Sequence, residues 1–120
     1  MATITVQTIT ESGITPTFAS ATAEGDVMDN DGKTFLMIKN GSGGSITVTV
    51  TAQVTSFDVG AFGPLTKSNA TIAVGAGAEG MIGPFAPLAF NTNDSQISIT
   101  YSGVTSLTVA GFRLDNKLIK

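Results

Sequence analysis

Apolar residues recur at every second position in several short runs of this chain, and this pattern limits its possible folds more than any other feature. In one run Ile46, Val48 and Val50 alternate with threonine, and in another Ile97 and Ile99 alternate with polar residues. A period of two places such side chains on one face of a β-strand. No run of useful length has the helical period. The sequence therefore predicts an all-β protein, a single-domain β-sandwich or jelly roll of about 6–8 antiparallel strands.

Glycine-rich turn segments between these runs predict two hairpins. The segment 40–44 (NGSGG) supplies residues that adopt positive φ in tight turns, so we expect it to join strands at 34–39 and 45–54. In the same way, Gly103 separates two alternating runs and predicts a second hairpin near the C-terminus, made of 97–101 and 104–114.

The remaining segments are less regular. Ile4 and Val6 alternate within a first strand at 3–8, and Ile9 falls out of phase, which predicts a bulge or bend. Glycine and proline in 80–90 exclude a regular central strand there. We further expect a weak edge strand within 15–23, a loop over 60–68 and a short strand around 72–74.

The size and the charge of the chain bear on its state of assembly. Its 120 residues fit one domain, 1–120, in which 115–120 is expected to form a short C-terminal tail. Charged residues make up 12% of the sequence, compared with about 25% in typical soluble domains. Such a surface leaves neutral and partly apolar area exposed unless a partner covers it. We therefore expect an oligomer or a larger assembly.

The composition also narrows the possible chemistry. The chain has no histidine and no cysteine, so it lacks the commonest general base, the thiol nucleophile and the usual zinc ligands. We expect no enzymatic activity and no cofactor. A net charge of −3 and scattered basic residues argue against nucleic acid as a partner. No run approaches the ~20 apolar residues that span a bilayer, and no secretory signal is visible, so we expect no membrane partner and synthesis in the cytoplasm.

One acidic segment, 24–32 (EGDVMDNDG), is a candidate for metal binding. Asp26, Asp29 and Asp31 offer the carboxylate oxygens that calcium prefers. Their D-x-x-D-x-D spacing lacks the strict alternation and the later glutamate of an EF-hand loop. The pattern favours a solvated turn and leaves a calcium site as the alternative.

The segment 84–88 (PFAPL) is apolar and kinked by two prolines, so it is not expected to complete a sheet. Two interpretations remain open. The segment either closes one end of the sandwich over its core or forms a contact with another subunit or with a capsid.

Three segments resemble the small head proteins of tailed phages: DGKTFLMIKNGSGGSITVTV (31–50), VGAGAEGMIGPF (74–85) and ITYSGVTSLTVAGFRL (99–114). The resemblance covers nearly the whole chain, although each motif alone is common in β-sandwiches. It implies a decoration or cement protein, with a jelly-roll or β-sandwich fold and usually trimeric. Such a protein binds the major capsid protein on the outer surface of the mature head, so the expected location is the virion. The family offers no catalytic residues.

From this resemblance and from the apolar segments we expect contacts within a homotrimer or with the capsid. The candidates come from the N-terminal segment, the run 35–38 and the IGPF segment with the proline that follows it: Ile4, Val6, Phe35, Met37, Ile82, Pro84, Phe85 and Pro87. The alternative function is a trimeric receptor-binding or carbohydrate-binding module associated with a phage tail or fibre.

Overall fold

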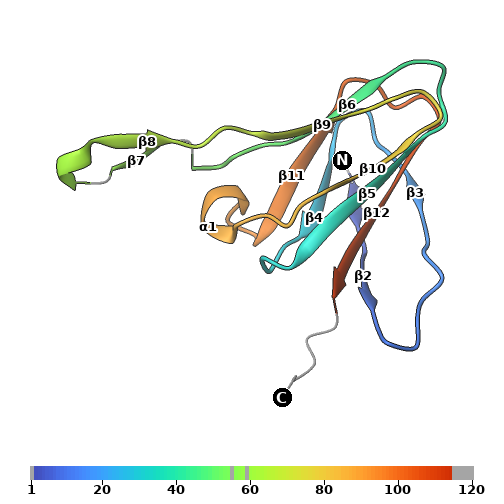
Figure 1. The fold of residues 1–120 in the computed structure, drawn as a ribbon, viewed down its shortest axis with the longest axis horizontal. Coiled ribbons are helices and arrows are strands. Elements are labelled where there is room, and N and C mark those ends of the chain that lie inside the picture. The colour runs from blue at the N-terminus through green and yellow to red at the C-terminus, as the bar shows by residue number, and fades with distance from the viewer. Residues whose placement is uncertain (1, 55, 59, 115–120) are drawn as a thin grey trace.

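The computed structural model describes residues 2–54, 56–58 and 60–114, and most of them form two sheets packed against each other (Figure 1). Sheet A has the order β1-β4-β11-β6-β9, with bounds Ala2–Ile4, Asp26–Asp29, Gln96–Tyr101, Ile46–Val50 and Ala70–Val74. Sheet B has the order β10-β5-β12-β2, with bounds Glu79–Ile82, Thr34–Asn40, Leu107–Leu114 and Val6–Ile9, and the short β3 (Ala19–Ser20) also pairs with β12. The predicted all-β sandwich is confirmed. The predicted tail, 115–120, lies outside the described residues.

Both sheets are mixed, which the sequence did not predict. Strand β1 pairs in parallel with β4, and β2 pairs in parallel with β12. Both parallel pairs involve the N-terminal segment, which was predicted as one strand. It forms two strands instead, because the chain leaves sheet A after Ile4 and enters sheet B at Val6. Each sheet has five strands, so the predicted number of 6–8 strands is too low. The prediction that all of them are antiparallel is also wrong, because each sheet contains one parallel pair.

The core lies between the two sheets and contains the alternating apolar residues of both. The side chains with no exposed surface include Met28, Leu36, Ile38, Val48, Val50, Ile97 and Ile99. Burial of a side chain of this size contributes about 1.5–3 kcal/mol, so these residues supply much of the stability. The period-two pattern therefore identified the core positions of 46–50 and 97–99 correctly.

The two predicted hairpins are wrong. Strand β5 pairs with β10 and β12 in sheet B, whereas the next strand, β6, pairs with β11 and β9 in sheet A. Likewise β11 belongs to sheet A and β12 to sheet B. In both places the turn residues reverse the chain, but the next strand joins the opposite sheet. The apolar faces of the two strands then pack against each other across the core, as in other β-sandwiches.

The side chain of Asn40 holds the corner between β5 and β6. It is 2% exposed, and its Nδ2 donates to the carbonyl oxygens of Gly44 and Val74, both at 2.8 Å. Its Oδ1 accepts from the backbone N–H of Ser42 at 2.9 Å and from the Ser42 hydroxyl at 2.7 Å. One buried amide thus ties the end of a strand in sheet B to β9 in sheet A.

A two-stranded ribbon replaces part of the predicted loop at 60–68. Strand β7 (Ser56–Asp58) pairs antiparallel with β8 (Pro64–Thr66) through the 3-10 turn η1 (Gly60–Phe62). The ribbon is inserted between the paired strands β6 and β9 and projects away from the sandwich (Figure 1). We call the segment 56–66, as far as the structure describes it, the arm.

Candidate functional site: a proline loop and an apolar sheet face

A hollow of about 560 Å³ lies where the chain crosses from β1 to β2. Its charged lining residues are already engaged. Arg113 forms an ion pair of 3.1 Å with Asp31, and the Asp29 carboxylate accepts a bond of 3.1 Å from the Gln96 side chain. A hydrogen bond from the backbone N–H of Lys33 holds the pKa of Asp31 below its usual value, with help from Thr34 and Arg113. A carboxylate held ionised in this way is a weak proton acceptor.

The three aspartates of the calcium candidate do not come together. Asp26 is 1% exposed and lies in the core, whereas Asp29 and Asp31 are exposed. The described residues contain no group of three or more acidic, histidine or cysteine side chains that could hold a metal ion. The favoured interpretation, a solvated turn, therefore fits Asp31 and is wrong for Asp26, whereas Asp29 is solvated but belongs to strand β4.

Asp26 instead connects the N-terminal strand to the centre of sheet A. Its Oδ2 accepts from the Tyr101 hydroxyl at 2.7 Å and from the Thr22 N–H at 3.2 Å, and its Oδ1 accepts from the Ala2 N–H at 3.2 Å. Burial raises the pKa of Tyr101 far above 10, and the hydrogen bond to Asp26 and its negative charge raise it further. Tyr101 packs against the core.

The raised pKa of Tyr101 predicts a loss of stability at alkaline pH. An unfolded tyrosine has a pKa of about 10, so above that pH the unfolded chain releases its proton while the folded chain keeps it. The stabilising contribution is complete below about pH 10 and falls at higher pH by up to about 1.4 kcal/mol per pH unit. Urea titrations at stepwise pH should show this slope, and Tyr101→Phe should remove it. The lysines also titrate in this pH range and are the same in both proteins. If the free energy of unfolding fell equally steeply with pH in Tyr101→Phe and in the unchanged protein, Tyr101 would not be the cause.

The segment 83–88, which we call the proline loop, is a rigid apolar projection. Phe85 is 2% exposed and Phe90 4%, and their ring centroids lie 5.6 Å apart. They anchor the loop and the single turn of α1 (Pro87–Phe90) in the core. Pro84, just before the first anchor, and Pro87, between the two, are exposed, and Leu88 is 75% exposed. The loop therefore presents apolar side chains to solvent from a fixed base.

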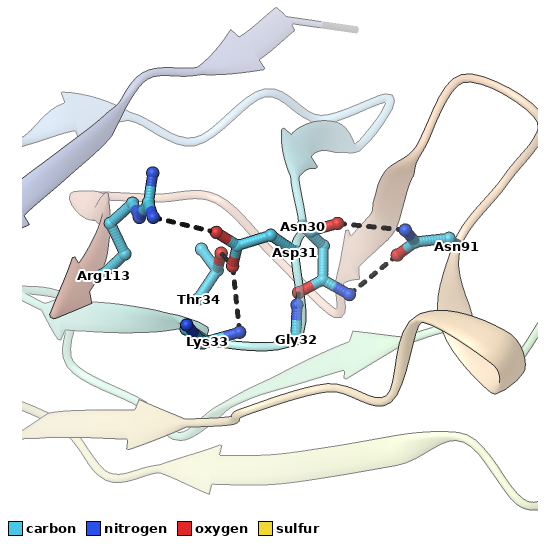
Figure 2. A network of polar contacts seen from close by, with 7 residues as sticks. All are labelled: Asn30, Asp31, Gly32, Lys33, Thr34, Asn91 and Arg113. Atoms are coloured by element: carbon cyan, nitrogen blue, oxygen red, sulfur yellow. Dashed lines mark hydrogen bonds and ion pairs between the residues drawn. The ribbon is translucent and has the colours of Figure 1, made fainter. Parts of the chain in front are cut away.

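A pair of asparagines fixes this base further (Figure 2). Asn30 is 5% exposed, and its Nδ2 donates to Asn91 Oδ1 at 2.7 Å and to the carbonyl of Phe85 at 3.1 Å. In return Asn91 Nδ2 donates to the carbonyl of Asn30 at 3.0 Å. At the start of the loop, a Cβ on Gly83 would lie 2.9 Å from the Cα of Phe35, so the backbone approaches β5 too closely for a side chain.

The outer face of sheet B is also apolar. Met81 lies opposite Met37, and Phe35 lies opposite Phe112 with ring centroids 5.7 Å apart. With residues of the loop after β2 they line a groove of about 360 Å³, made of Ile9, Gly13, Ile14, Pro16, Phe35, Met37, Met81 and Phe112. We call this the apolar groove. Met81 is 56% exposed within it.

The outer face of sheet A has the opposite character. Thr49 lies opposite Thr71 on one side and Thr100 on the other. Thr47 and Ser98 point to the same side of this sheet, since they alternate with buried residues. Threonine suits such outward strand positions, because its branched side chain favours the strand and its hydroxyl faces water.

The predicted contact residues divide into three groups. Ile4, at 7% exposed, and Phe85 belong to the core, so their assignment as contact residues is wrong. Val6 and Ile82 are partly buried and pack against the core. Phe35 and Met37 lie in the apolar groove, and Pro84 and Pro87 are exposed on the proline loop.

Exposed apolar residues that were not among the predicted contact residues include Phe62, Met81 and Leu88, which are 89%, 56% and 75% exposed. A signal existed for Met81, because it is out of phase with Ile82 in the same strand and must face the other side. Phe62 and Leu88 lie outside the strands, where alternation gives no information.

Comparisons with known proteins identify no relative. No family model matches the chain, and no match was found among the curated proteins or the solved structures. In the part of the chain that the structure describes, no helix is both long enough and apolar enough to span a membrane.

Proposed function

We propose that this chain is a structural virion protein that binds the outside of a tailed-phage head and stabilises it, as a decoration or cement protein. The observation that carries the proposal is the proline loop. Its exposed Pro84, Pro87 and Leu88 are held by the buried anchors Phe85 and Phe90. A fixed, exposed apolar projection suits a partner surface with a complementary pocket, because little conformational entropy is lost on binding.

The low charge of the chain supports the same proposal. With 12% charged residues, the protein relies on partners to cover its apolar surface. The partner in this proposal is the major capsid protein, and the proline loop would bridge neighbouring capsomers. A ligand that binds only the mature lattice adds its binding free energy to the stability of that lattice.

Replacing Leu88 by aspartate tests this role. Leu88→Asp places a charge at an exposed apolar position of the proline loop and should weaken binding to heads by about a hundredfold or more, because a buried unpaired charge costs several kcal/mol. The measurement is cosedimentation of the purified protein with heads prepared without it, taken from the phage that carries this sequence. Heat-induced release of DNA from the same heads reports stabilisation.

The matched control is Thr100→Asp, which places the same charge on the exposed outer face of sheet A. It should bind heads like the unchanged protein. Both variants should keep the same circular dichroism and unfolding midpoint, since neither position is in the core. If Leu88→Asp bound as tightly as Thr100→Asp, the proline loop would not be the capsid contact.

The second candidate is a receptor-binding or carbohydrate-binding module of a tail or fibre. The hollow between β1 and β2 favours it, because hydroxyls of Thr3, Thr5, Thr8 and Ser95 line it together with Arg113. Polar groups converging on a hollow can orient a sugar. Copy number separates the two functions: a head protein is present in many copies per particle, and a tail module in few.

A further inference from the structure

The arm exposes apolar surface that its own chain does not cover. Phe62, at its tip, is 89% exposed. The sequence of 55–66 (TSFDVGAFGPLT) has a single charged residue, Asp58. A two-stranded ribbon without further packing is marginally stable in water, and its two open edges invite pairing. The arm therefore needs a partner surface, and that surface has to be apolar.

The tip of the arm is built to present Phe62. Gly60 and Gly63 have φ of 60° and 79°, and the N–H of Gly63 donates to the carbonyl of Gly60 at 3.1 Å. Asp58 Oδ1 accepts from the Gly60 N–H at 3.2 Å, so the charge of the arm also serves the turn. A tight turn with defined hydrogen bonds holds the aromatic ring outward at small entropic cost.

The direction of the arm is set at its base. The N–H groups of Gln53 and Val54 both donate to the carbonyl of Ala89 in α1, at 2.8 and 3.1 Å. On the returning side the Lys67 ammonium lies 5.2 Å from the centroid of the Phe90 ring. Both sides of the base thus rest on the helical turn that anchors the proline loop, and Figure 1 shows α1 beneath the arm.

The apolar groove is the matching surface on this chain. Its lining combines flexible methionines, Met37 and Met81, with Phe35, and such residues accommodate an inserted aromatic ring well. On the same sheet face the Lys39 ammonium lies 4.2 Å from the centroid of the Phe18 ring. The groove lies on the outer face of sheet B, whereas the arm extends from β6 and β9 of sheet A. The arm of one chain is therefore directed away from the groove of that chain.

We infer that the arm binds the apolar groove of a second copy of this chain, with Phe62 inserted beside Met37 and Met81. Each copy then gives one arm and receives one, so the contact closes either as a reciprocal two-fold dimer or as a ring, depending on the rotation between copies. The occupant is a second copy because the arm and the groove have matching apolar character on one molecule and face different directions. This inference goes beyond the proposed function, since the contact forms without a head.

Cysteine cross-linking tests the contact directly, because the chain has no native cysteine. Phe62→Cys and Met81→Cys proteins are mixed, oxidised and compared with each protein alone. We expect a disulfide dimer of the two different variants, in clear excess over dimers of either one. The matched control mixes Phe62→Cys with Thr100→Cys, in which the second thiol is exposed on the outer face of sheet A. Equal cross-linking in both mixtures would overturn the inference.

Light scattering gives the second test. The unchanged protein should have a solution mass of at least two chains of 12.2 kDa each. Phe62→Asp should shift this mass to one chain, and Thr100→Asp should not. Circular dichroism establishes that Phe62→Asp is folded, which is expected because Phe62 is exposed. A single-chain mass for the unchanged protein, or an unchanged oligomer in Phe62→Asp, would overturn the inference.

The two proposals fail separately. If the unchanged protein is a single chain in solution but binds heads, the arm contact is refuted and the cement function stands. If the protein forms cross-linked oligomers but does not bind heads, the arm contact stands and the cement function is refuted.

Discussion

Replacing Gly111 by valine is expected to lower the free energy of unfolding by about 3 kcal/mol or more, which is a large share of the 5–15 kcal/mol typical of a domain. Gly111 lies in the middle of β12, and a Cβ there would overlap Met28 Sδ and lie 3.4 Å from Ile4 Cγ2. Met28 has no exposed surface, so its side chain has no empty space to enter.

The backbone around Gly111 cannot relieve this overlap. Strand β12 is paired on both sides, with Gly111 opposite Leu36 in β5 and Val6 in β2. A shift of β12 would break both ladders. Urea unfolding followed by circular dichroism measures the loss, and Gly43→Val is the control, because a Cβ on Gly43 meets nothing within 4 Å. An unchanged unfolding midpoint in Gly111→Val would show that the two sheets are less closely packed at this point.

Removal of the Asp26 carboxylate is expected to have the next largest effect. Asp26→Ala should destabilise the protein by about 2–4 kcal/mol, because hydrogen bonds to a charged group contribute about 1.5–3 kcal/mol and their donors lose their acceptor. The buried donor is the Tyr101 hydroxyl, and the N–H of Ala2 lies at the start of β1. We therefore expect β1 to separate from β4 before the rest of the sandwich unfolds.

Asp29→Ala is the matched control, since Asp29 is exposed and accepts its bond from the side chain of Gln96. A surface bond of this kind contributes about 1 kcal/mol or less. Amide hydrogen exchange in 2–4 should be faster in Asp26→Ala than in the unchanged protein, and it should be unchanged in Asp29→Ala. Equal unfolding midpoints for the two variants would contradict the role assigned to Asp26.

The sequence predicted the core well and the connections poorly, for a physical reason. Alternation is a local property, so it placed Ile46, Val48 and Val50 on one face, and all three are buried. The turn at 40–44 also has local signals, but those signals specify a reversal of direction and not which sheet receives the next strand. The buried side chain of Asn40 completes the corner through a bond to Val74, which is distant in sequence and invisible to a local pattern.

The candidate site was predicted in part. The prolines of 84–88 indicated an irregular apolar loop, and Phe85 closes the core as the first interpretation predicted, whereas Pro84 and Leu88 face solvent and their contact with a partner stays a proposal. The error at Phe85 arose because composition gives no direction for a side chain outside a strand. The arm was missed because 60–68 contains glycine and proline, which mark loops and ribbon turns alike.

The corners between the sheets also affect how the chain reaches its fold. Because β5 and β6, and β11 and β12, lie in opposite sheets, the arm strands β7 and β8 are the only consecutive strands within the described residues that pair with each other. Every other ladder joins strands that are not neighbours in the chain, as when Tyr101 pairs with Val48 or Ile4 with Met28. Loop-closure entropy is therefore lost before most ladders form, and such a topology folds slowly, with its first stable contacts made between distant segments.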